Sequence, residues 1–149
     1  MPSLYATGPL RTPWHLWLVG VIATLWNAMG AVDYLMTKTR NEAYMSQFTP
    51  EQLEFFYGFP VWLTAFWAIA VWGGLLGAVL LLMRKRLAFP VLLLSFLAML
   101  VTTIHHYGFA NGLEVLGGGG TLIFSGVIFL VALLLVFYAR AMSRRRVLT

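Results

Sequence analysis

The stretch Trp26-Asn27-Ala28-Met29-Gly30-Ala31-Val32-Asp33-Tyr34 decides how this chain folds. It lies inside an apolar run from about Trp14 to Met36, which is long enough to cross a bilayer with some tilt. Asn27 and Asp33 interrupt that run with an amide and a carboxylate. Polar side chains in a membrane span are costly, so they face a bundle interior, a partner or water. The stretch therefore predicts a membrane-spanning helix and marks where a functional site is to be sought.

The composition of the whole chain also indicates a membrane protein. Hydrophobic residues make up 60% of the 149 residues and charged residues 10%, whereas soluble domains contain about 25% charged residues. So few charges could not cover a water-facing surface. The chain contains no cysteine, which removes thiolate catalysis, iron–sulfur ligation and thiolate zinc sites. We expect one integral membrane domain over residues 1–149.

Three further apolar runs predict spans at about residues 60–83, 87–107 and 121–138. If both termini are cytoplasmic, eight of the ten basic residues lie inside, namely Arg11, Arg84, Lys85, Arg86, Arg140, Arg144, Arg145 and Arg146. This bias follows the positive-inside rule. It predicts an all-α, up-down four-helix bundle in a bacterial inner membrane, with both ends cytoplasmic. Because the basic residues serve as topology signals, the net charge of +5 does not predict a nucleic-acid partner.

The first outer loop contains a well-marked helix start. Thr49 and Gln52 have the spacing of a capping box, and Pro50 occupies the first helical position. Phe48 and Leu53 have the spacing of a hydrophobic staple across the same start. Apolar residues then recur on one face of the helix. We expect a short amphipathic helix at about residues 50–57 that lies on the membrane surface.

Four polar residues could form a functional seam. Asn27 lies near the middle of the first span, whereas Asp33 is about 4–5 Å from its outer end by helical rise. His106 lies at a similar depth in the third span, with Glu114 in the loop above it. An Asp–His pair at this depth could relay protons or couple them to transport. Together with Glu114 it could also bind a divalent metal.

Structural roles for these residues stay open as alternatives. Seams of polar side chains commonly hold membrane helices together without any further function. His105 and His106 are about 100° apart on a helix, so they cannot both face one interior point. Asp33 could instead reach water or pair with Lys38 or Arg40.

Glycines predict where helices approach closely. Gly73 and Gly77 are four residues apart in the second span, and a missing side chain there lets another backbone come near. Gly30 in the first span is expected to serve packing in the same way.

Four segments of the first half resemble a known group of proteins, namely residues 11–17, 26–34, 48–53 and 56–60. In these segments the chain resembles short four-span bacterial inner-membrane proteins of unknown function, sometimes labelled sugar-transporter-like. The resemblance implies a class of solute but no mechanism, and it carries over no catalytic residue. Transporters usually show internal repeats or broken helices, and the two halves of this chain show neither.

Three functional hypotheses follow. We expect a chain that is not an enzyme, with no catalytic residue and, under the leading hypothesis, no cofactor or metal. The leading one is an accessory subunit that packs laterally against a larger membrane complex or against itself, in contact with lipid. The second is a small carrier of a solute or of protons, working as an oligomer through Asn27, Asp33 and His106. The third and weakest is a metal- or haem-binding redox protein that uses His105, His106 and Glu114.

Overall fold

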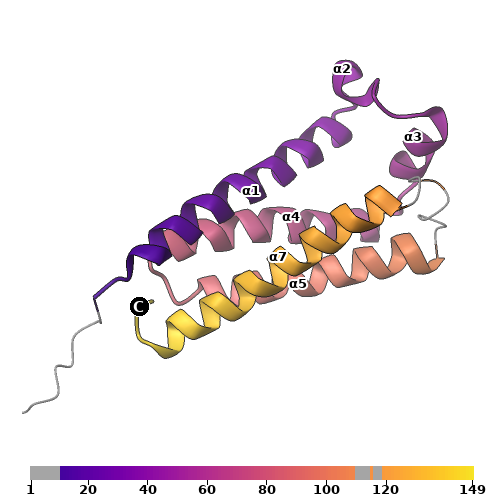
Figure 1. Ribbon diagram of the computed structural model, residues 1–149. Helices are drawn as coiled ribbons and strands as arrows, with labels where there is room; N and C mark the ends of the chain where they lie inside the picture. The colour runs from indigo at the N-terminus through magenta and orange to yellow at the C-terminus, as the bar shows by residue number, and fades with distance from the viewer. Residues whose placement is uncertain (1–10, 110–114, 116–118) are drawn as a thin grey trace, which may run out of the picture.

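Four long helices make up most of the protein. The computed structural model describes residues 11–109, 115 and 119–149, and this described part contains no strand. The long helices are α1 (Trp14–Lys38), α4 (Val61–Leu82), α5 (Ala88–Ile104) and α7 (Gly119–Arg144). Each is long and apolar enough to cross a membrane, α5 together with the turn that continues it to Gly108. The predicted all-helical architecture with four candidate spans is therefore confirmed (Figure 1).

Three short elements lie together at one end of the bundle. They are α2 (Glu42–Met45), α3 (Pro50–Tyr57) and the π-helical turn η1 (His105–Phe109), which continues α5. We refer to this end as the loop end. The opposite end carries the turn between α4 and α5 and the C-terminus (Figure 1), and we refer to it as the basic end.

Three helices stop in the same backbone motif, with an arginine at a positive φ. The φ angle is 53° at Arg40, 58° at Arg84 and 58° at Arg146. After α4, the Lys85 N–H donates to the carbonyl of Leu80 at 2.9 Å. This is the Schellman pattern, which satisfies carbonyls that a helix end leaves without partners. It lets the chain reverse within a short basic turn between α4 and α5.

The bundle is held together along α4, which packs against both α1 and α5, while α7 packs on α5. Gly73 and Gly77 face α5. A Cβ atom on Gly77 would lie 2.6 Å from the side chain of Leu92, and one on Gly73 would lie 3.2 Å from the Cβ of Ser95. Both glycines therefore occupy positions of close helix approach, where a larger residue would force the backbones apart.

Gly30 is not a packing position within this chain, so that prediction is wrong here. A Cβ atom on Gly30 would meet no other atom within 4 Å. The α1 ribbon diverges from α4 toward the loop end (Figure 1). Gly30 lies off the stripe of α1 that still reaches α4, where Asn27 meets Gly74 and Tyr34 packs on Trp67. Gly30 lies in the outer half of α1, one turn before Asp33.

The C-terminal segment packs into the bundle at the basic end. Helix α7 continues to Arg144, beyond the predicted end of the span at Tyr138. Val147 and Leu148 after it are buried. The Thr149 N–H donates to the carbonyl of Arg84 at 2.8 Å, which ties the segment to the turn between α4 and α5. Val147 and Leu148 are therefore part of the core, and the exposed Thr149 is held at the turn by its backbone.

Candidate functional site

A cavity of about 150 Å³ lies at the loop end, between α1, α3 and η1. We refer to it as the aromatic cavity. Its lining residues come from α1, α3, α4, η1 and the loops before α3 and α4: Asp33, Thr37, Phe48, Phe56, Phe59, Trp67 and His106. The structure thus brings together two of the polar residues that the sequence singles out, Asp33 and His106, and surrounds them with aromatic rings.

Asp33 is held by a tyrosine from the loop. The Tyr44 hydroxyl donates a hydrogen bond to Oδ1 of Asp33. Tyr44 lies on α2. The backbone N–H of Tyr44 donates to Oδ1 of Asn41 at 3.0 Å, and this bond caps the first turn of α2. Burial and the neighbouring carboxylate raise the pKa of Tyr44 to about 12. The phenol therefore stays protonated, and keeps donating to Asp33, well above neutral pH.

The basic residues near Asp33 are directed elsewhere. The guanidinium carbon of Arg40 lies 4.2 Å from the centre of the Tyr57 ring, which is a cation–π contact. Lys38 is exposed, and the lining of the cavity contains neither lysine nor arginine. Tyr44, rather than Lys38 or Arg40, is thus the residue that contacts the carboxylate of Asp33.

Helix α3 brings its aromatic residues over the cavity. Its start has both halves of the capping box, because Gln52 N–H donates to Thr49 Oγ1 at 3.2 Å and Thr49 N–H donates to Gln52 Oε1 at 3.1 Å. Phe48, before the cap, packs edge-on against Phe56 with ring centres 5.2 Å apart. The Nε2 atom of Gln52 also donates to the carbonyl of Val115 at 3.4 Å. The cap therefore fixes both the direction of α3 and the ring pair that lines the cavity.

The π-helical turn η1 separates the two adjacent histidines. The His106 ring stacks on Phe59, with ring centres 4.7 Å apart and an angle of 18° between the planes. His105 instead meets the edge of Trp62, with ring centres 5.6 Å apart. Only His106 of the pair lines the aromatic cavity. Single π-turns inside helices are frequent at functional sites, and this one directs His106 into the cavity.

Asn27 does not line the aromatic cavity. Asn27 is in mid-bundle, where its Nδ2 donates to the carbonyl of Ala23 in the same helix at 2.8 Å. Its Oδ1 faces Gly74, so closely that a Cβ atom on that glycine would overlap it. Among the described residues Asn27 therefore makes no hydrogen bond to another helix, and it packs in a notch of α4. Glu114 lies outside the described residues.

The aromatic lining is what the sequence reasoning missed. Phe48, Phe56, Phe59 and Trp67 all line the cavity, yet each could equally be a lipid anchor or a core residue when seen as sequence. The density of aromatic residues between Tyr44 and Phe59 was the signal that could have revealed them, because a water-exposed loop does not need so many rings.

The described residues contain no group of three or more His, Asp or Glu side chains that could hold a metal ion. Comparison of the chain with protein-family models, with curated proteins and with solved structures gives no match. Function must therefore be argued from the geometry of the cavity and the distribution of charge.

Proposed function

We propose that this chain is a multi-pass protein of a bacterial inner membrane that binds a small solute in the aromatic cavity and carries it as part of an oligomer. The observation that supports this is the cavity itself, which combines the half-buried carboxylate of Asp33, the imidazole of His106 and four aromatic rings. A few polar groups converging in an otherwise apolar pocket are typical of small-molecule sites. The lining supplies groups for binding and orientation rather than for bond cleavage.

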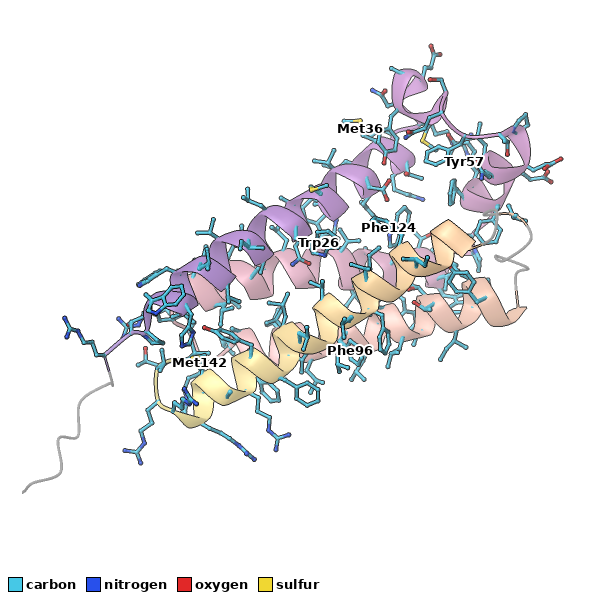
Figure 2. All side chains as sticks on the ribbon, in the orientation of Figure 1. Trp26, Met36, Tyr57, Phe96, Phe124 and Met142 are labelled. Carbon is cyan, nitrogen blue, oxygen red and sulfur yellow. The ribbon has the colours of Figure 1, made fainter. Side chains whose placement is uncertain are left out.

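The distribution of charge supports an outward-facing cavity. Figure 2 shows nitrogen-tipped side chains gathered at the end of the bundle where α7 finishes, opposite α2 and α3. Arginines at this basic end come from the turn after α4 and from the end of α7. By the positive-inside rule the basic end is cytoplasmic. Both termini are then inside, the aromatic cavity opens to the outer side, and α3 lies at the outer membrane surface.

A carrier needs its site to be reachable, and the surroundings of Gly30 favour this. Gly30 is close to Asp33 on α1, and the space beside it is empty for at least 4 Å. Asp33, one turn further on, lines the cavity. Within the described residues no atom packs against Gly30, so this position of α1 near the cavity is uncovered, which suits access of a solute.

Ligand-dependent stability tests the proposed solute site. Purified protein in detergent is screened against sugars, amino acids, amines and organic acids by thermal unfolding. A true ligand at about a hundred times its Kd stabilises the folded state by about 2.7 kcal/mol. We expect such a ligand to stabilise the wild type and to have little effect on a variant carrying both Asp33→Asn and His106→Ala.

The matched control carries Glu54→Gln and His15→Ala. Glu54 is an exposed carboxylate on α3 outside the cavity, and His15 lies at the basic end, where its Nδ1 is 2.6 Å from the Tyr138 hydroxyl. This variant should keep the ligand response. If the control and the cavity variant respond alike to every solute that stabilises the wild type, the aromatic cavity is not the binding site.

A second candidate function is that of an accessory subunit packed laterally in the membrane. It is favoured by an apolar groove of about 200 Å³ between α1 and α7, lined by Val19, Ile22, Ala23, Trp26, Val131 and Leu135. Trp26 and Phe124 meet across these helices, with ring centres 6.5 Å apart (Figure 2). Copurification of one defined complex from native membranes supports this role, whereas a particle of monomer size after mild solubilisation contradicts it.

A further inference from the structure

The charge of the aromatic cavity is unbalanced. Among the described residues, Asp33 is the one carboxylate in the lining, and these residues place no lysine or arginine there. Within the described residues, the Tyr44 hydroxyl is the donor that reaches this carboxylate, and it uses Oδ1. No hydrogen bond to Oδ2 is found among the described residues, so this oxygen is available to a ligand. Removing a carboxylate from water is costly unless a charge of opposite sign accompanies it, so the cavity favours a positively charged occupant.

The aromatic rings favour a cation as well. Phe48, Phe56, Phe59 and Trp67 line the same space as Asp33. The face of an aromatic ring carries negative potential and attracts a cation whose centre lies within about 6 Å of the ring centre, tryptophan most strongly. An anion would be repelled by the same rings and by the carboxylate. Aromatic cages of this type recognise quaternary ammonium groups.

The lining does not suit an inorganic cation. Calcium takes six to eight oxygen ligands, and magnesium demands nearly octahedral oxygen coordination. Among the described lining residues, two side chains offer oxygen atoms, Asp33 and Thr37. The cavity volume of about 150 Å³ also exceeds the roughly 10–15 Å³ that one water molecule needs on the same measure. The space fits a small organic ion better than a dehydrated metal ion.

We infer that the aromatic cavity binds a small organic cation of the ammonium class, with its positive centre between the carboxylate of Asp33 and the aromatic rings. The inference rests on the proposed function, since it names the class of solute that the same cavity takes. Asp33 supplies the opposite charge, and Trp67 and Phe56 supply ring surface. His106, stacked on Phe59, closes one wall. Tyr44 holds the carboxylate in place.

The test compares choline with its uncharged isostere dimethylbutanol, in which carbon replaces the quaternary nitrogen. Both are titrated calorimetrically into the full chain in detergent. We expect choline to bind at least about tenfold more tightly than the isostere, because only choline gains the ionic and cation–π contacts. Asp33→Asn should weaken choline binding by about tenfold or more. The exposed control Glu54→Gln should leave it unchanged.

Asp33→Asn preserves the shape of the side chain and an oxygen acceptor for Tyr44, so the loop keeps its structure. Trp67→Leu is a second, independent variant, and it should weaken choline severalfold while affecting the isostere less. Equal affinity for choline and the isostere, or unchanged choline affinity in Asp33→Asn, overturns the cation inference.

The proposed function can survive that result. If an uncharged solute from the stability screen binds in the cavity while choline does not, the site is real and the class of ligand is wrong. If no solute distinguishes the cavity variant from its control, the proposed function and the cation inference both fall.

Discussion

Gly74 and Gly30 are both helical glycines with opposite surroundings, and they show how much a single position depends on its neighbours. A Cβ atom on Gly74 would overlap Oδ1 of Asn27 and lie 3.3 Å from the Oγ of Ser95. A Cβ atom on Gly30 would meet nothing within 4 Å. Overpacking a tight contact is destabilising, whereas glycine in an open helical position only adds conformational entropy to the unfolded chain.

Alanine substitutions should therefore change stability in opposite directions at these two positions. Gly74→Ala should lower the free energy of unfolding by about 1–3 kcal/mol, because it forces Asn27 out of its notch. Gly30→Ala should raise it by about 0.5–1 kcal/mol. Thermal unfolding of the two variants in the same detergent measures both effects. The packing described for α1 is contradicted if Gly74→Ala stabilises the protein. It is also contradicted if Gly30→Ala lowers the free energy of unfolding as much as Gly74→Ala does.

At the scale of elements, local sequence rules predict some features and not others. The capping box of α3 was predictable because Thr49, Pro50 and Gln52 act within one turn. The π-helical turn η1 was not predictable, since its residues make tertiary contacts: His105 with Trp62, and His106 with Phe59. The aromatic cavity combines both kinds of feature. Its polar members followed from their depth in the membrane, but its aromatic members depend on how α3 folds back.

The end of α7 illustrates the same limit and gives a prediction. A basic, polar sequence after Tyr138 looks like a free tail, yet Leu148 is only 1% exposed. Leu148→Ala should lower the free energy of unfolding by about 2–5 kcal/mol, as expected for a leucine removed from a packed core. Leu134→Ala, at a position of α7 that is 56% exposed, is the matched control and should change stability much less. Thermal unfolding in detergent compares them, and equal losses contradict the docking of residues 147–149.

The whole molecule is polarised along its long axis, and this polarity connects the fold with the proposed function. The basic end gathers the turn after α4 and the end of α7, while α2, α3 and η1 gather the aromatic cavity at the other end. The number of spans followed from hydropathy alone, because each apolar run closes its own hydrogen bonds as a helix. The divergence of α1 from α4 could not be predicted from hydropathy, since it depends on contacts between residues far apart in the sequence.

The absence of cysteine from the sequence makes the proposed orientation directly measurable. Gln47→Cys introduces a single thiol at an exposed position between α2 and α3, and Met83→Cys introduces one at the basic end, where Met83 is 57% exposed. In intact cells, a thiol reagent that cannot cross the inner membrane should label Gln47→Cys, whereas Met83→Cys should react only after the membrane is opened. This result is expected because arginine-rich ends stay cytoplasmic. The reverse pattern would place the aromatic cavity on the cytoplasmic side, so that the chain would take its solute from within the cell.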